Sequence, residues 1–492
     1  MRKAGILLPV FSVPSRYGIG DFGEGAYRFI DFLAGSGQSY WQVLPLGPTT
    51  VGDSPYQSPS AFGGNPYFIS LDILRKEGLL KEDELRQIEY GKRIEYAHLY
   101  NTRYHILRTA FSRFDKTDRE YRDFCEENKD WLSDHTLFYA IKKHFNYLPF
   151  NLWNDGIKHR ITSDMNHYRD EFSEEIEFSK FIQFKFYSQW KALKKYANDK
   201  GIKIIGDMPI YVSYDSCDVW KNPHLFELDD HLLPKRVAGC PPDSFSEDGQ
   251  LWGNPLYAWD EHEKDGYSWW IKRLKHAFSM FDSVRIDHFR GFDEYYAIDY
   301  GEETAKNGVW EKGPGMKLFS ALKENIKEDN IIAEDLGFIT PSVKKLLADT
   351  GYAGIKVLQF AFDSRDTGNG NDYLPHNYQE KCVAYTGTHD NQTLSSWLDT
   401  ITEKELQNVR NYLCDFYTPK EKLNLPLISS IMMSKAGISI VPVQDYMGLS
   451  DEARINTPGA AFGNWNFRLS WEDLGEELCD KIRKITKVYE RV

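Results

Sequence analysis

Short apolar runs recur along the chain, and each ends in polar residues. Eight of them have the length of buried strands: Ala4–Pro9, Tyr40–Leu46, Ile202–Val212, Ser283–Asp287, Asn330–Glu334, Ile355–Phe360, Lys381–Thr386 and Ala436–Val443. Most intervals between these runs are long enough to hold a helix. Because repeated alternation of strand and helix is typical of a (β/α)8 TIM barrel, we expect residues 1–492 to form one α/β catalytic barrel.

The longest interval, residues 71–200, predicts a mainly helical segment inserted between the second and third strands. It is rich in Glu, Lys, Leu and Tyr, and from Phe178 to Tyr196 its apolar residues recur at three- to four-residue steps. Shorter helices are expected over Lys81–Ile88, Ala97–Phe114 and Ser133–Phe145. Because a helical stretch, Trp471–Val488, lies near the chain end, we expect no C-terminal β-domain.

Composition excludes some classes of protein. Acidic residues outnumber basic ones, 73 to 60, which argues against a nucleic-acid partner. No apolar stretch predicts a signal peptide or a membrane span. The six cysteines are scattered without metal-ligand spacing, so we expect buried free thiols, no metal and a cytoplasmic protein. Aromatic residues make up 15% of the chain, and some can serve as platforms for sugar rings.

Three acidic residues end predicted barrel strands: Asp287, Glu334 and Asp390. The carboxyl ends of barrel strands converge, so these side chains should lie together. Arg285 precedes Asp287 by two residues, points to the same side and favours its ionised form. Converging carboxylates repel each other, and at least one should therefore keep its proton.

A nucleophilic carboxylate beside a protonated carboxylic acid is what retaining glycoside cleavage requires. The alternative is that barrel strands end in acidic residues for solubility or helix capping. That explanation suits any one of the three residues, but it suits all three together far less well.

The segments Arg-Ile-Asp-His-Phe-Arg-Gly (285–291), Ala-Glu-Asp-Leu-Gly (333–337) and Gly-Thr-His-Asp-Asn (387–391) resemble those of glycoside hydrolase family 77, the amylomaltases. More specific blocks lie at 54–66, 206–212, 239–257 and 454–459. The resemblance covers nearly the whole chain. It implies a 4-α-glucanotransferase that needs no cofactor.

The resemblance also implies residue roles. Asp287 would be the nucleophile, Glu334 the general acid/base, and Asp390 would hold sugar hydroxyls and stabilise the transition state. Asp335 should face away from the site. The residues expected to contact substrate are Tyr56, Asp207, Trp252, Asn254, Arg285, His288, His389, Asn391, Asn456 and Gly459.

Several of these assignments have plain structural alternatives. Tyr56 matches a sugar-stacking tyrosine but is otherwise a core residue. Asp207 either orients Tyr56 or a sugar hydroxyl, or caps a turn. The segment 239–257 resembles a mobile loop over the active site, and the alternative is an inert connection. Asn456 and Gly459 resemble a facing loop, whereas Trp465 is expected in the core.

A loop that holds sugar and excludes water favours transfer over hydrolysis. We therefore expect α-1,4-glucan or maltooligosaccharide donors, and glucose or maltooligosaccharide acceptors. The nearest alternative is a hydrolase of the α-amylase type, because the same carboxylates serve both reactions. An inert glucan-binding protein is the alternative from another class, but binding alone would not require a buried acidic cluster with its repulsion.

Overall fold

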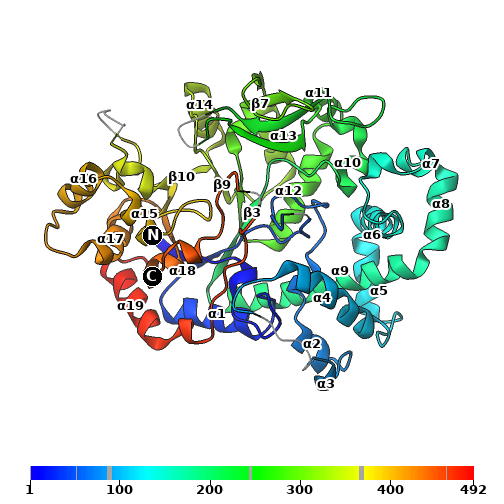
Figure 1. The fold of residues 1–492 in the computed structure, drawn as a ribbon, viewed down its shortest axis with the longest axis horizontal. Coiled ribbons are helices and arrows are strands. Elements are labelled where there is room, and N and C mark those ends of the chain that lie inside the picture. The colour runs from blue at the N-terminus through cyan, green and yellow to red at the C-terminus, as the bar shows by residue number, and fades with distance from the viewer. Residues whose placement is uncertain (1, 51, 86–90, 243–245, 365–370, 461) are drawn as a thin grey trace.

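The computed structural model describes residues 2–50, 52–85, 91–242, 246–364, 371–460 and 462–492. At its centre eight parallel strands form a closed barrel (Figure 1). These strands are β1 (Lys3–Leu7), β2 (Tyr40–Gln42), β3 (Lys203–Met208), β6 (Ser283–Ile286), β9 (Ile331–Ala333), β10 (Ala353–Val357), β11 (Cys382–Tyr385) and β12 (Ile438–Pro442). Each overlaps one of the eight predicted runs, so the predicted barrel is confirmed.

The barrel strands follow one another in chain order, and the last closes on the first. β12 pairs with β1 from Lys3↔Ile438 to Leu7↔Pro442. Inward-facing apolar side chains fill the interior, so the barrel is a packed core rather than a pore. They are Leu7, Ile205, Ile332, Ile355, Val357, Val383, Tyr385 and Ile440.

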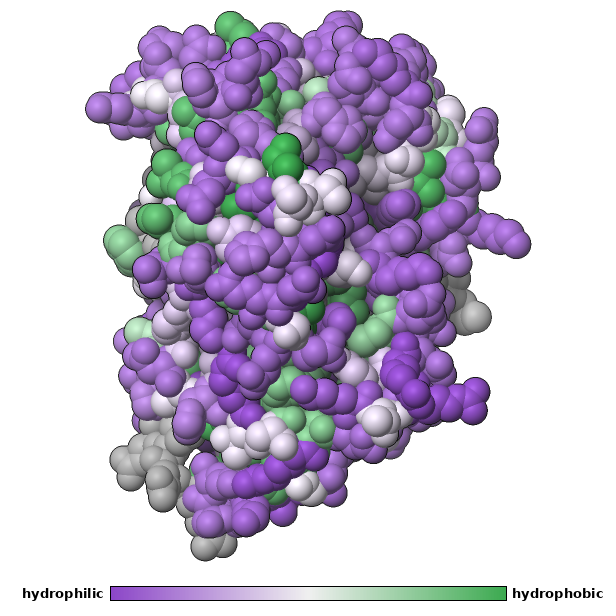
Figure 2. Space-filling view, turned by 90° about the vertical axis from the view of Figure 1, so that its right-hand side faces the viewer, coloured by the Kyte–Doolittle hydropathy of each residue, from purple (hydrophilic) through white to green (hydrophobic). Residues whose placement is uncertain are grey.

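The interval between β2 and β3 folds into helices, at the right of Figure 1. Predicted helices overlap α3, α4, α6 and α9, although residues 86–88 lie outside the described part. Phe186 and Trp190 of α9 pack on Phe22, each with ring centroids 5.1 Å apart, so this segment shares its core with the barrel. Its outer face is mainly hydrophilic (Figure 2). The helices are α2 (Leu71–Lys76), α3 (Glu82–Leu85), α4 (Tyr96–Phe111), α5 (Arg119–Glu127), α6 (Lys129–His144), α7 (Asp155–Lys158), α8 (Thr162–Glu171) and α9 (Ser173–Asp199).

The remaining helices surround the barrel. They are α1 (Glu24–Gly35), α10 (Cys217–Lys221), α11 (Trp259–Lys264), α12 (Ser268–Met280), α13 (Met316–Asn325), α14 (Pro341–Thr350), α15 (Leu394–Thr400), α16 (Glu403–Leu413), α17 (Asn424–Met433), α18 (Val443–Met447) and α19 (Glu476–Val488). Within the described residues, no strand follows β12.

A second, antiparallel sheet was not predicted. It consists of β4 (Arg236–Cys240), β5 (Gln250–Pro255), β7 (Glu294–Asp299) and β8 (Val309–Lys312), in the order β5-β4-β7-β8. The sequence indicated a loop over 239–257, but strands occupy both ends of that segment. Residues 243–245 between them lie outside the described part.

The cysteines differ from the expectation of buried thiols. No disulfide joins them, but only Cys217 and Cys382 are buried, whereas Cys414 is exposed. Among the described residues, no helix is long and apolar enough to cross a membrane.

One buried carboxyl group, just after the carboxyl end of β12, predicts a pH-dependent stability. Asp445 of α18 accepts hydrogen bonds from the Thr386 hydroxyl and the Leu394 N–H. Burial nevertheless raises the pKa of Asp445 from 3.8 to about 6. Because the pKa of this carboxyl group is higher in the folded protein than in the unfolded chain, its contribution to the free energy of unfolding is fully present below about pH 4. That contribution is lost as the pH rises through 6, by about 3 kcal/mol in total.

We therefore expect the free energy of unfolding of Asp445→Asn not to fall in this way as the pH rises. Melting temperatures should be measured from pH 4.5 to pH 7. The melting temperature of the variant should rise relative to that of the wild type as the pH rises. A difference that stays constant over this range would contradict the assignment.

Candidate active site

The polar residues of the site come from the carboxyl ends of β3, β6, β9 and β11. Asp207 of β3 and Arg285 of β6 are direct partners across the sheet. Asp287 follows β6, and Glu334 follows β9, whose Ile332 pairs with Arg285. Because the barrel strands are parallel, these side chains emerge at the same end.

Arg285 is the centre of this cluster. Its side chain is only 3% exposed, and its Nη1 donates to both carboxylate oxygens of Asp207, at 2.7 and 2.6 Å. Its Nη2 lies 3.1 Å from Asp287 Oδ1 and 3.2 Å from Glu334 Oε2. One guanidinium thus faces three carboxyl groups, and its single positive charge cannot balance three negative ones.

The excess negative charge favours the protonated form of Glu334. Burial, and then the charge of Asp287, raise the pKa of Glu334 well above its ordinary value. Glu334 Oε2 also accepts the His288 N–H at 2.6 Å. His288 has a φ of 49°, an uncommon conformation for a residue other than glycine, and this conformation belongs to the turn that presents its N–H to Glu334.

The carboxyl groups of Asp287 and Glu334 are close enough for double displacement. Asp287 Oδ1 and Glu334 Oε2 both lie within 3.2 Å of the same Arg285 nitrogen. Retaining enzymes hold their two carboxyl groups about 5–5.5 Å apart, whereas inverting enzymes leave about 6.5–9.5 Å for a water molecule. The arrangement therefore suits attack by Asp287 and proton donation by Glu334.

Asp390 is the most open of the three predicted catalytic carboxylates, with its side chain 40% exposed. His389 Nε2 lies 3.3 Å from Asp390 Oδ2, and Asn456 Nδ2 donates to Oδ1 at 2.6 Å. Arg454, which was not among the predicted site residues, donates to the Asp390 carbonyl at 2.7 Å. The 454–456 segment therefore orients Asp390.

Two predicted substrate contacts, Asn391 and Gly459, lie outside the Arg285 cluster and stay predictions. The Asn391 side chain accepts from Thr388 N and Oγ1, both at 2.9 Å, so it closes its own turn. Gly459 lies on an exposed loop with a φ of 81°, and no other atom lies near the place of a side chain. Gly459 is therefore not part of the packed site.

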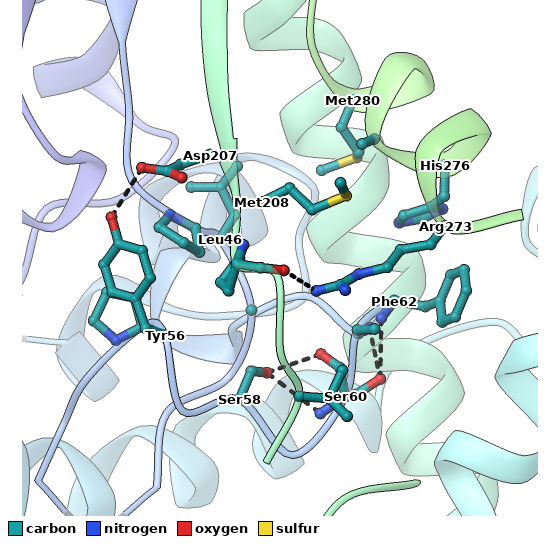
Figure 3. A pocket seen from close by; sticks show the side chains of 18 of the residues that line it. Leu46, Tyr56, Ser58, Ser60, Phe62, Asp207, Met208, Arg273, His276 and Met280 are labelled. Carbon is teal, nitrogen blue, oxygen red and sulfur yellow. Dashed lines mark hydrogen bonds between the residues drawn. The ribbon is translucent and has the colours of Figure 1, made fainter. Parts of the chain in front are cut away.

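Tyr56 is linked to Arg285 through Asp207. Its hydroxyl donates to Asp207 Oδ2 at 2.8 Å (Figure 3). Its ring stacks on His389, with centroids 5.2 Å apart and an interplanar angle of 15°. Trp465, expected in the core, is buried as predicted but also packs beside both rings, at 5.9 and 6.1 Å. Asp207 thus orients Tyr56, one of the two roles considered.

Trp252 and Asn254 lie on β5, at the edge of the small sheet. The Trp252 ring stands nearly perpendicular to His288, with centroids 4.8 Å apart. Asn254 is buried, and its Nδ2 donates to the Val212 carbonyl at 2.8 Å. The Asn254 amide therefore serves contacts within the protein.

Asp335 faces away from the site, as expected. Its Oδ1 accepts the Ile355 N–H of the neighbouring strand at 2.7 Å, and its carboxylate fills the space above Gly354. Of two adjacent acidic residues, only Glu334 joins the cluster.

A hollow behind Tyr56 and Asp207 extends toward α9 and α12 (Figure 3). It is lined mainly by apolar side chains, including Leu46, Met208 and Met280, and it does not contain Asp287, Glu334 or Asp390. The predicted catalytic carboxyl groups therefore lie outside this hollow. The described residues contain no group of three or more His, Cys, Asp or Glu that could hold a metal ion.

Comparison with known protein families and solved structures identifies the class of enzyme. Residues 8–473 match the glycoside hydrolase family 77 profile, described as 4-alpha-glucanotransferase. The structure is similar to that of an amylomaltase from Streptococcus agalactiae in complex with acarbose, with a TM-score of 0.96, 40% sequence identity and full coverage of both chains.

Individual relatives agree with this class. The chain is 47% identical over 489 residues to a 4-alpha-glucanotransferase of Clostridium butyricum, covering 98% of this chain and 99% of the relative. It is 44% identical over 501 residues to one of Thermus thermophilus, covering 100% and 99%. The chain therefore belongs to glycoside hydrolase family 77, the 4-alpha-glucanotransferases.

Proposed function

We propose that this chain transfers α-1,4-glucan segments between maltooligosaccharides by double displacement at the Arg285 cluster. The observation that carries the proposal is the single guanidinium between Asp287 and Glu334, together with the raised pKa of Glu334. One carboxyl group is thereby prepared as a nucleophile and the other as an acid. The donors are α-1,4-glucans, and the acceptors are glucose or maltooligosaccharides.

In the first step, Asp287 attacks the anomeric carbon of the donor and forms a glycosyl-enzyme ester. The glycosidic bond breaks, and the Glu334 proton passes to the leaving oxygen. In the second step, the ionised Glu334 takes the proton from an acceptor hydroxyl, whose oxygen bonds to the anomeric carbon and releases Asp287. The chemistry needs no cofactor, because the protein carboxyl groups supply both the nucleophile and the proton.

The other site residues stabilise the reacting sugar. Asp390, which Asn456 and Arg454 orient, accepts hydrogen bonds from sugar hydroxyls that strengthen as positive charge develops on the ring. Tyr56 offers its ring as a stacking surface. The segment 239–257, with Trp252 over His288, acts as a lid that keeps acceptor sugar in place and water out. We also propose a cytoplasmic location, as the scattered cysteines suggested.

Incubation with maltotriose tests this function. We expect chromatography to show a ladder of longer maltooligosaccharides together with glucose. Glucose and maltose without longer products would instead indicate hydrolysis, and binding without any product would indicate an inert glucan-binding protein.

A further inference from the structure

Gln57 follows Tyr56 directly but is absent from the predicted site, and its side-chain amide joins three segments. Its Nε2 donates to the Trp252 carbonyl at 3.2 Å and to Asn254 Oδ1 at 3.1 Å. Its Oε1 accepts from Ser213 Oγ at 3.0 Å and from Asn254 Nδ2 at 3.4 Å. Gln57 thus connects the Tyr56 loop, strand β5 and the segment that follows β3.

The backbone around Trp252 depends on this amide because the sheet is irregular there. Among the strands that the structure describes, β5 is an edge strand whose one partner is β4. The pairing shifts register between Val237↔Pro255 and Gly239↔Leu251, and Gly253 has a φ of 75°. Such irregularities re-aim side chains at sheet edges and leave backbone groups without ladder partners. The Trp252 carbonyl lies within this irregular stretch and accepts from the Gln57 amide.

Trp252 links Gln57 to the reaction centre through His288. Its ring packs on His288, and the His288 N–H donates to Glu334 Oε2. On the other side of Gln57, Tyr56 bonds to Asp207, which pairs with Arg285. The amide therefore closes a ring of contacts that passes through both the lid and the catalytic carboxyl groups.

We infer that Gln57 is a positioning residue that holds Trp252 over the site and so sets how the glycosyl-enzyme divides between sugar acceptor and water. This inference rests on the proposed function. Gln57 acts through Trp252 and Asn254 and does not itself touch the reacting atoms. Loosening Trp252 admits water to the ester at Asp287, because lids favour transfer by excluding it.

Gln57→Glu tests the inference, since it keeps the shape of the side chain but removes both N–H donors. It also places a carboxylate oxygen against the Trp252 carbonyl and Asn254 Oδ1. Transfer leaves the number of reducing ends unchanged, whereas hydrolysis adds one. The ratio of new reducing ends to transfer products from maltotriose is therefore independent of how much enzyme is folded. We expect this ratio to rise about 5- to 10-fold, as for the loss of one or two hydrogen bonds.

Gln189→Glu is the matched control. Gln189 is a buried glutamine whose amide likewise bridges separate segments, through the backbone N–H and C=O of Ser70, and it bonds to neither β5 nor the site. It should lower the melting temperature and leave the ratio unchanged. Ser213→Ala, which removes one donor to Gln57, should raise the ratio by a smaller factor and serves if Gln57→Glu does not fold.

An unchanged ratio in Gln57→Glu, or an equal rise in Gln189→Glu, would overturn the inference. So would an unchanged ratio in Ser213→Ala if Gln57→Glu does not fold. The wild-type ladder from maltotriose tests the proposed function separately. Suppose that the wild type disproportionates maltotriose and that Gln57→Glu has the same product ratio as the wild type. The proposed function then stands, and only the role of Gln57 is refuted.

Discussion

Asp287→Asn should abolish disproportionation of maltotriose, with kcat falling by about 10⁴-fold or more. The amide keeps the size of the side chain and can still accept a hydrogen bond from Arg285 Nη2, which lies 3.1 Å from Asp287 Oδ1. It cannot form the glycosyl ester, so both steps of the transfer are lost. Product chromatography over long incubations measures the residual rate, and the melting temperature reports folding.

Asp335→Asn provides the control for this change. It makes the same replacement of a carboxylate by an amide, on a side chain that bonds to Ile355 N and faces away from the cluster. Its kcat should stay close to that of the wild type. Activity of Asp287→Asn within tenfold of the wild type would remove Asp287 from the role of nucleophile.

Glu334→Gln should reduce kcat on maltotriose by about 10²- to 10⁴-fold, the usual contribution of a general acid. The loss should depend on the leaving group. α-Maltosyl fluoride releases fluoride without needing a proton, so formation of the glycosyl-enzyme from this donor should be much less impaired. Rapid measurement of fluoride release separates this first step from the transfer that follows.

The pH profile gives a second measurement of Glu334. Burial and Asp287 raise its pKa, and the acid acts only while protonated, so wild-type kcat/KM should fall as the pH rises through that pKa. With the fluoride donor, this alkaline fall should be absent from Glu334→Gln. An alkaline limb that persists in the variant would assign it to another group.

The barrel could be predicted because its strands are buried on both faces. Such strands form continuous apolar runs that end in polar residues, and the fourth and fifth runs placed Asp287 and Glu334 correctly at the barrel mouth. The small sheet could not be predicted in this way. β8 is exposed at Val309 and Trp310, and β5 combines half-exposed residues with Gly253, so neither shows a continuous apolar run.

The hydrogen-bond partners of side-chain amides were even harder to predict from the sequence. Asn254, Asn391 and Asn456 all occur in blocks typical of the family, yet each is bonded to its own protein, to Val212, Thr388 and Asp390 respectively. An amide donates and accepts equally well toward a sugar or a backbone, so residue type and spacing do not decide between them. Gln57 was passed over for the same reason.

The pairing of β12 with β1 also constrains how the chain is made. Residues 438–442 close the barrel against residues 3–7, and Arg491 ties this seam by donating to the carbonyls of Lys3 and Ala436. During synthesis, β1 therefore keeps one edge unpaired until residues 438–442 have left the ribosome. Sheet edges exposed in this way invite mispairing. The nascent chain should consequently be most prone to aggregation, and most dependent on chaperones, just before β12 emerges.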